Sequence, residues 1–156
     1  MSKRIAIVED EKAIRENYAS AFRREGYSVE MYEARRPALD AFDARLPDLV
    51  VIDINLKDDV EGGFELCREL RSRSADLPII FLTARDSEFD IVSGLRLGAD
   101  DYLTKDISLP YLMVRVAALF RRLDVMKNPN SDDNRLSRGN LELDIDRMTV
   151  RWKDQP

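Results

Sequence analysis

The chain has 156 residues, of which 44% are apolar and 35% are charged, as is typical of a globular protein. Its net charge of −5 argues against a polyanion-binding module, and the absence of histidine excludes histidine-based catalysis, histidine metal ligands and a phosphohistidine on this chain. No apolar run approaches the roughly 20 residues that span a bilayer, no secretory signal is visible, and the single cysteine permits no internal disulfide, so we expect a cytoplasmic protein with no membrane partner.

Short apolar runs alternate along the chain with segments of helical period. In chain order, the runs predict strands at residues 4–8, 27–32, 49–53, 78–84 and 101–105. Amphipathic segments that follow them predict helices at residues 11–26, 36–47, 63–73, 88–98 and from about 108 to 122. Continuous apolar strands that alternate with helices indicate a parallel sheet covered on both faces.

This alternation predicts an α/β fold of five βα units, with a flavodoxin-like sheet of strand order 2-1-3-4-5. In such sheets ligands bind beyond the carboxyl ends of the strands, at the switch point between the first and third strands. We therefore look for functional side chains at the strand ends.

The character of the chain changes after Leu123, which divides it into three predicted parts. Residues 1–123 form the α/β domain, and the polar stretch 124–134, which contains Pro129, is predicted to be a linker. Residues 135–156 alternate apolar and polar side chains around a turn, which predicts a β-hairpin. One hairpin buries too little surface to fold alone, so we interpret it as the opening of a second, truncated domain.

Polar side chains end four of the five predicted strands, and all would meet at one edge of the sheet. They are Glu9, Asp10, Asp53, Thr83 and Lys105. Three carboxylates at close range repel one another unless a cation neutralises them, and hard oxygen ligands suit Mg²⁺. We expect Asp10 and Asp53 to bind Mg²⁺ directly, Glu9 through water, and Asn55 through its backbone carbonyl.

A carboxylate beside Mg²⁺ can act as a nucleophile toward an activated phosphoryl group. We therefore predict that Asp53 is a phosphoryl acceptor. Lys105 would stabilise charge on the phosphoryl oxygens, and the Thr83 hydroxyl would donate a hydrogen bond to the transferred group.

The motifs "IVEDE", "VVIDINL", "FLTAR" and "GADDYLTK" together resemble those of the response-regulator receiver domain of two-component systems, over about residues 3–123. The last motif, with the linker and "LSRGNLELDIDRMTVRW", is similar to the OmpR/PhoB subfamily, in which a small sheet precedes a winged-helix DNA-binding domain. A narrower similarity, to regulators of the proteobacterial dedicated sortase system, involves "EGGFELC" and "LTKDIS".

The resemblance implies a partner sensor histidine kinase whose phosphohistidine supplies the phosphoryl group to Asp53. The chain would be no enzyme beyond assisting its own phosphorylation and slow dephosphorylation. Thr83 and Tyr102 would form a switch pair, in which the hydroxyl moves toward the phosphate and the ring packs inward behind it. That change would promote homodimerisation, and promoter DNA would be bound only through a C-terminal domain beyond Pro156.

Three regions depart from the family pattern. Asp106 follows Lys105 at the position where relatives have a proline preceded by a cis peptide bond. A cis bond before a residue other than proline costs roughly 2.5 to 4 kcal/mol. The peptide bond between Lys105 and Asp106 is therefore either trans or a strained cis bond. The loop "KDDVEGG" is longer and more acidic than usual, and its charge could perturb metal or kinase contacts. On the dimer face, apolar character replaces one ion pair. The candidate residues there are Ile91, Asp100, Asp101, Tyr111, Arg115 and Arg122.

Three alternatives compete with this interpretation. A haloacid-dehalogenase-like phosphatase needs a second acid two residues after its aspartate nucleophile, and Asn55 holds that position. A flavodoxin-like FMN binder needs a glycine- and hydroxyl-rich phosphate loop, whereas "EDEKAIR" is acidic. The serious alternative is a receiver-like module that dimerises without phosphorylation, for which Asp106 and the longer loop leave room.

Overall fold

The computed structural model describes residues 2–57 and 59–127. Its internal contacts divide the chain into two compact units, residues 1–114 and 115–156, and each is described by itself. The first unit holds the sheet and its acidic edge. The second is described over residues 115–127, which are helical.

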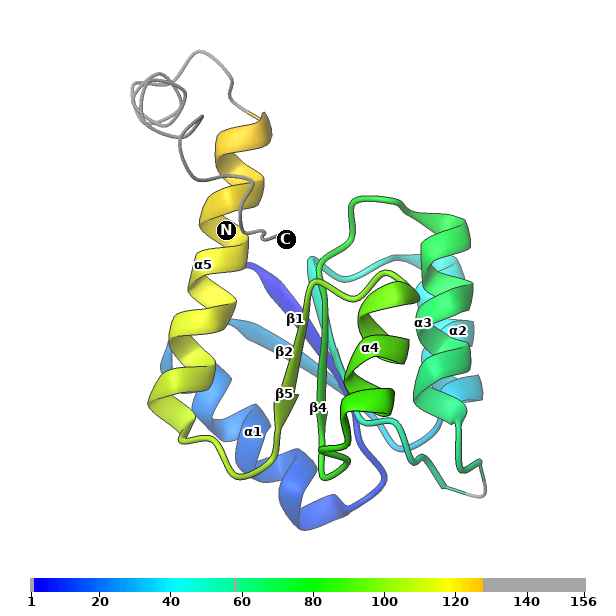
Figure 1. The fold of residues 1–156 in the computed structure, drawn as a ribbon. Helices are drawn as coiled ribbons and strands as arrows, with labels where there is room; N and C mark the ends of the chain where they lie inside the picture. The colour runs from blue at the N-terminus through cyan, green and yellow to red at the C-terminus, as the bar shows by residue number, and fades with distance from the viewer. Residues whose placement is uncertain (1, 58, 128–156) are drawn as a thin grey trace, which may run out of the picture. The chain divides into compact units, whose positions relative to one another are not determined.

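The sheet has five parallel strands within the described residues, in the order β2-β1-β3-β4-β5 (Figure 1). These strands are β1 (Arg4–Val8), β2 (Ser28–Tyr32), β3 (Leu49–Ile52), β4 (Ile79–Thr83) and β5 (Asp101–Thr104). The flavodoxin-like order predicted from the alternation of strands and helices is confirmed. The order reverses between β1 and β3, which places the switch point between them.

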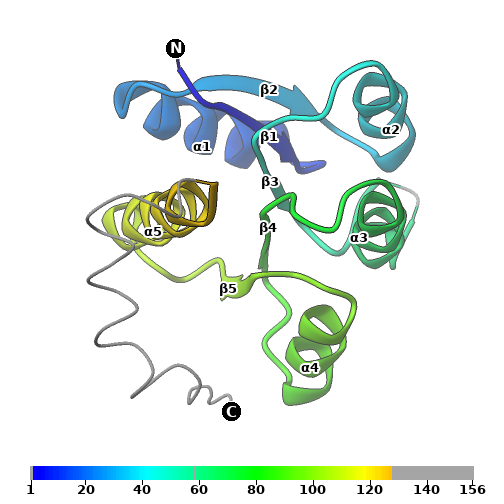
Figure 2. The same ribbon diagram turned by 90° about the horizontal axis from the view of Figure 1, so that it is seen from above.

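A helix follows each strand in the described part of the chain. The helices are α1 (Lys12–Arg24), α2 (Arg35–Ala44), α3 (Gly62–Arg73), α4 (Glu88–Arg96) and α5 (Leu109–Lys127). Figure 2 shows α1 on one face of the sheet and α2, α3 and α4 on the other. None of the helices in residues 2–57 and 59–127 is both long and apolar enough to cross a bilayer.

The central strands are buried, except at Arg4 at the start of β1, because helices cover both faces of the sheet. Every residue of β3 and β4 is buried, as the continuous apolar runs predict. On the side of α2 and α3, Phe81 packs edge-to-face against Phe64, with ring centroids 5.5 Å apart. Cys67 lies fully buried in the same cluster, and burial raises the pKa of its thiol to about 11, which agrees with a core thiol rather than a nucleophile.

α5 is longer than the sequence pattern predicts. It continues to Lys127, so residues 124–127, assigned to the start of the linker, are helical. Asp124, Val125, Met126 and Lys127 contain no helix breaker, and the first proline beyond them is Pro129. The rest of the predicted linker and the predicted hairpin over 135–156 lie outside the described residues.

Candidate functional site

The candidate site is built from residues that immediately follow three strands. Each is held by one more backbone hydrogen bond of the parallel type: Asp53 N–H donates to the Val8 carbonyl at 3.0 Å, and Lys105 N–H to the Thr83 carbonyl at 2.9 Å. Glu9 N–H donates to the carbonyl of Tyr32 at 3.0 Å. The sheet therefore fixes the backbone of the site even though the side chains lie just beyond the strands.

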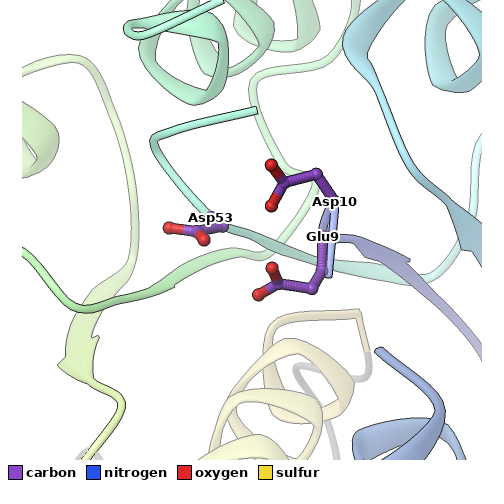
Figure 3. Close-up of side chains that lie close together, drawn as sticks. All are labelled: Glu9, Asp10 and Asp53. Carbon is purple, nitrogen blue, oxygen red and sulfur yellow. The ribbon is translucent and has the colours of Figure 1, made fainter. Parts of the chain in front are cut away.

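Three carboxylates gather at this edge. Glu9, Asp10 and Asp53 each offer an oxygen within 4.8 Å of the others, and Figure 3 shows the carboxylates grouped beyond the ends of β1 and β3. Glu9 and Asp53 are buried, with 2% and 6% of their surface exposed, whereas Asp10 is more open to solvent. The structure thus brings together the three acids that the strand ends predicted.

Lys105 contacts two of the three acids. Its Nζ lies 2.8 Å from Asp53 Oδ2 and 2.9 Å from Glu9 Oε1. Burial by itself would lower the pKa of this ammonium group, but the hydrogen bonds to Asp53 and Glu9 outweigh it and the net shift is upward. Lys105 is therefore held in its charged form at the centre of the site.

Glu9 has the most perturbed carboxyl group of the site. Burial is the main cause, and the charge of Asp53 adds to it; the pKa of Glu9 rises to about 7 although Lys105 and the Glu11 N–H both act to lower it. One ammonium does not compensate three acids at this edge. When all three acids are ionised, two negative charges remain uncompensated, which equals the charge of a divalent cation.

The donor set fits Mg²⁺. Carboxylate oxygens are its preferred protein ligands, and water usually completes its coordination shell. Asp10, the most open of the three acids, lies on the solvent side where such waters can be accommodated. The backbone carbonyl of Asn55, predicted as a further ligand, belongs to an exposed residue two positions beyond Asp53.

Thr83 and Tyr102, the predicted switch pair, lie on neighbouring strands and share one contact residue. Thr83 is 1% exposed, and its Oγ1 accepts a hydrogen bond from the N–H of Arg85 at 3.3 Å. The Tyr102 hydroxyl donates to the carbonyl of Arg85 at 2.8 Å. Its ring lies 5.9 Å from that of Phe81, and burial raises the pKa of Tyr102 to about 12. The ring therefore occupies an inward, partly buried position.

Arg85 has no role predicted from the sequence, yet its side chain reaches the loop after β3. Its guanidinium donates to Asn55 Oδ1 at 2.5 Å and to the Val60 carbonyl at 2.7 Å. It also pairs with Glu61 at 3.1 Å. Nothing in the spacing of "FLTAR" predicts these contacts, because they join loops about 25 residues apart in sequence.

The acidic loop predicted at residues 57–63 ends at Glu61, since α3 begins at Gly62, and two of its acids are paired. Asp59 Oδ2 lies 3.3 Å from Arg35 Nε, and Glu61 Oε2 lies 3.1 Å from Arg85 Nη1. Leu56 and Asp59 also exchange two backbone hydrogen bonds, of 3.0 and 2.8 Å. The arginines offset much of the negative charge that the composition suggested.

The peptide bond between Lys105 and Asp106 is trans, since residues 2–57 and 59–127 contain no cis peptide bond. The alternative of a strained cis bond, left open by the sequence, is therefore wrong. The side chain of Asp106 is hydrogen-bonded to the Thr104 hydroxyl.

The residues predicted for a dimer face have different environments. Ile91 is half-buried on α4, and Tyr111 is exposed in the first turns of α5. Asp100 accepts hydrogen bonds within the chain, from Arg71 Nη2 at 3.0 Å and from the N–H of Ile79 at 2.8 Å. Asp101 is half-buried. Arg115 and Arg122 belong to the second unit.

Comparison with protein families gives a match to a model described as the response regulator receiver domain, over residues 5–117. These residues span β1 to the first half of α5 and include the acids, Thr83, Tyr102 and Lys105.

Two curated relatives illustrate the similarity. The chain is 37% identical to the transcriptional regulatory protein CreB of Escherichia coli (strain K12) over 150 residues, which cover 96% of this chain and 63% of CreB. It is 46% identical to the response regulator MprA of Mycolicibacterium vanbaalenii over 122 residues, covering 78% of this chain and 52% of MprA. The matches therefore span between about half and two thirds of these longer proteins.

Solved structures of receiver domains are also similar to this chain. The beryllofluoride-activated DrrB receiver domain has a TM-score of 0.71 and 27% identity, and the match covers 78% of this chain and 99% of that one. A CheY-like response regulator receiver domain protein from Methanospirillum hungatei has a TM-score of 0.73 and 27% identity, with 83% and 100% covered. The chain thus belongs to the response-regulator receiver domain family, and its curated relatives CreB and MprA are regulators of the OmpR/PhoB type.

Proposed function

We propose that this chain is the regulated part of a two-component response regulator, and that Asp53 accepts a phosphoryl group from a phosphohistidine of a partner sensor histidine kinase. The contact of the buried Asp53 carboxylate with Lys105, at 2.8 Å, carries the proposal. It places a nucleophile and a fixed positive charge side by side within an acidic cluster that suits Mg²⁺.

In the proposed reaction one carboxylate oxygen of Asp53 bonds to phosphorus while the P–N bond of the phosphohistidine breaks. The bonding electrons leave with the imidazole, which takes up a proton from water. Lys105 contributes positive charge beside the oxygens on which negative charge develops. A bound Mg²⁺ would add positive charge at the same oxygens, held by Asp10, Asp53 and the Asn55 carbonyl directly and by Glu9 through water.

Thr83 and Tyr102 would report phosphorylation to the surface of the domain. Thr83 Oγ1 acts as acceptor in its contact with Arg85, so its hydroxyl hydrogen can still be donated to a phosphoryl oxygen. Tyr102 would hold its inward position behind Thr83, and this pair would promote homodimerisation through a surface that includes α4, β5 and the start of α5.

The output would be control of transcription through a C-terminal DNA-binding domain, as the subfamily and the longer relatives suggest. CreB carries the description of a transcriptional regulatory protein. The domain would be no enzyme beyond promoting its own phosphorylation and slow dephosphorylation. A cytoplasmic location completes the proposal, in keeping with the free, buried thiol of Cys67.

A second candidate function is dimerisation without phosphorylation. One observation favours it: the Tyr102 ring packs inward against Phe81, and its hydroxyl donates to the Arg85 carbonyl. If this position suffices for dimerisation, the acid cluster would modulate the dimer rather than create it.

Intact mass after incubation with acetyl phosphate tests the first function. We expect the mass to increase by one phosphoryl group with Mg²⁺ present and to stay unchanged when the metal is chelated. Borohydride reduction of the acyl phosphate followed by peptide mapping should locate the modification at Asp53. Absence of any adduct at saturating Mg²⁺ would move the conclusion to the phosphorylation-independent dimer.

The Ile91→Lys variant tests the proposed dimer surface. α4 and the start of α5 carry exposed apolar side chains, which are Phe89, Val92, Leu95, Tyr111 and Val114. A lysine there would bring a charge into an apolar contact, so we expect the dimerisation constant of the phosphorylated chain to weaken about tenfold, as an interface residue worth about 1.4 kcal/mol would produce. Sedimentation equilibrium measures it.

Ser20→Lys is the matched control, because it adds the same charge at an exposed position on α1, on the opposite face of the sheet. It should leave the dimerisation constant unchanged. Equal dimerisation of the Ile91→Lys variant and wild type would show that α4 is not part of the interface.

A further inference from the structure

Arg85 lies in the loop between β4 and α4 and contacts both residues of the proposed switch pair through its backbone. Its N–H donates to Thr83 Oγ1 at 3.3 Å, and its carbonyl accepts from the Tyr102 hydroxyl at 2.8 Å. A shift of this one peptide segment would therefore alter the hydrogen bonding of both switch residues.

The side chain of the same residue is bound to the loop that follows the acceptor strand. The guanidinium contacts the Asn55 amide oxygen at 2.5 Å, the Val60 carbonyl at 2.7 Å and Glu61 at 3.1 Å. Its Cζ lies 5.9 Å from the centroid of the Phe64 ring. With 19% of the side chain exposed, Arg85 is held by several partners at once, which fixes its geometry better than one surface ion pair does.

The inward position of the Tyr102 ring depends on the space beside α4. An added Cβ on Gly94 would lie 3.0 Å from a ring carbon of Tyr102 and 3.0 Å from a ring carbon of Phe81. Glycine inside a helix costs about 1 kcal/mol relative to alanine, so packing against the two rings accounts for Gly94. The ring thus has a fitted position, in which its hydroxyl donates to the Arg85 carbonyl.

We propose that Arg85 is a positioning residue that couples the acidic loop at residues 57–61 to Tyr102. By tying the β4–α4 loop to Val60 and Glu61, the guanidinium holds the Arg85 carbonyl where the Tyr102 hydroxyl reaches it. The loop is one of the regions in which this chain departs from the family pattern, so its contacts would set how firmly this chain holds the ring inward.

The inference rests on the proposed function only where it concerns phosphorylation; the coupling between loop and ring concerns the unmodified chain. Where phosphorylation is involved, a state that already holds Tyr102 inward should bind a phosphoryl group or its mimic more tightly. Weakening the loop contact should therefore weaken binding of beryllofluoride.

Two variants loosen the coupling without touching the acid cluster. Glu61→Gln keeps the shape of a side chain that is 56% exposed and removes its charge; Arg85→Met removes the guanidinium but keeps the backbone contacts possible. Glu65→Gln is the matched control, since it removes one charge from an exposed glutamate on α3 that pairs with Arg68 rather than with Arg85.

The first measurement is the NMR signal of the Tyr102 ring in the Mg²⁺-free chain with labelled tyrosine, assigned through Tyr102→Phe among the five tyrosines. We expect the signal to move toward that of a solvent-exposed tyrosine in Arg85→Met, to move part of the way in Glu61→Gln, and to stay in place in Glu65→Gln. A Tyr102 signal that stays at the wild-type position in both Arg85→Met and Glu61→Gln would overturn the proposal, whatever the chain does with phosphate.

The second measurement is a double-mutant cycle on the affinity for beryllofluoride with Mg²⁺. Glu61→Gln should weaken binding about threefold in the wild-type background and leave it unchanged in the Tyr102→Phe background, because the hydroxyl that transmits the effect is gone. Equal losses in both backgrounds would show that Glu61 acts on the site without Tyr102 and contradict the coupling. Failure of the wild type to bind beryllofluoride would instead reject the proposed function, and the ring signal would still decide the coupling.

Discussion

Replacing Asp53 by asparagine is expected to abolish acceptance of a phosphoryl group and to remove most of the stabilisation of the fold by Mg²⁺. The amide is nearly the same size as the carboxylate but is a poor nucleophile and carries no charge. The intact mass after acetyl phosphate treatment should therefore equal that of the untreated chain. Its thermal unfolding should respond much less to Mg²⁺ than that of the wild type.

The expected effect of Mg²⁺ on thermal unfolding arises because the metal binds the folded chain and not the unfolded one. A ligand that binds only the folded chain stabilises it by about 1.4 kcal/mol at ten times its dissociation constant. Asp53 is one of three acids whose oxygens lie within 4.8 Å of one another, and its charge would be shared between Mg²⁺ and Lys105. Because cation affinity rises with the number of charged ligands, we expect Mg²⁺ to bind the variant about tenfold or more weakly.

Asp40→Asn is a suitable control, because it removes the same charge from an exposed position on α2. It should accept the phosphoryl group and respond to Mg²⁺ as the wild type does. Phosphorylation of Asp53→Asn at the wild-type level would place the acceptor elsewhere. An undiminished effect of Mg²⁺ on its unfolding would remove Asp53 from the metal ligands.

Gly63→Ala is expected to lower the free energy of unfolding on the order of 3 kcal/mol, the upper end of the usual cost of overpacking. An added Cβ would lie 2.2 Å from the carbonyl oxygen of Asp53 and 2.6 Å from Cα of Ile54. These are backbone atoms of the segment that leaves the central strand, and they cannot rotate away as a side chain can. Urea unfolding measures the loss.

The same clash should also impair phosphorylation. The N–H of Gly63 donates to the Ile54 carbonyl at 2.8 Å, so the first turn of α3 rests directly on the backbone beside the acceptor. Forcing α3 outward would shift Asp53 away from Lys105. We therefore expect slower phosphorylation by acetyl phosphate even at temperatures where the variant remains folded.

Gly62→Ala separates this steric effect from the general effect of glycine replacement. A Cβ there would meet the side chain of Asp59 at 3.0 to 3.2 Å, and that carboxylate can move. Alanine also gains about 1 kcal/mol over glycine in a helix, so we expect a nearly unchanged free energy of unfolding. Equal stabilities of Gly63→Ala and wild type would mean that α3 can lift from the backbone at no cost.

The candidate residues whose placement could be predicted from the sequence are those whose position depends on the strands. Asp53 and Lys105 follow runs of buried apolar residues, and parallel strands bring their carboxyl ends to one edge. The apolar runs determine where each strand ends, so the grouping of acids and lysine follows from local patterns. The strand order was predictable for the same reason, since five βα units favour few arrangements.

Local sequence patterns do not predict the contacts of Arg85 and Asp100. Arg85 joins Val60 and Glu61 to Tyr102, and Asp100 is held by Arg71 and the N–H of Ile79; each set of contacts joins residues far apart in sequence. An arginine in a loop and an aspartate before a strand have many possible partners of equal chemical suitability. Only the packing of the loops selects among them.

The sequence by itself therefore determined the fold, the family and the three acids that gather at the carboxyl edge of the sheet, because burial and periodicity act over neighbouring residues. The tertiary structure decided the partners of the arginines, the trans peptide after Lys105 and the inward position of Tyr102. A long polar side chain can reach several partners at similar free energy. Which partner it contacts depends on the distance between loops, and no local sequence pattern encodes that distance.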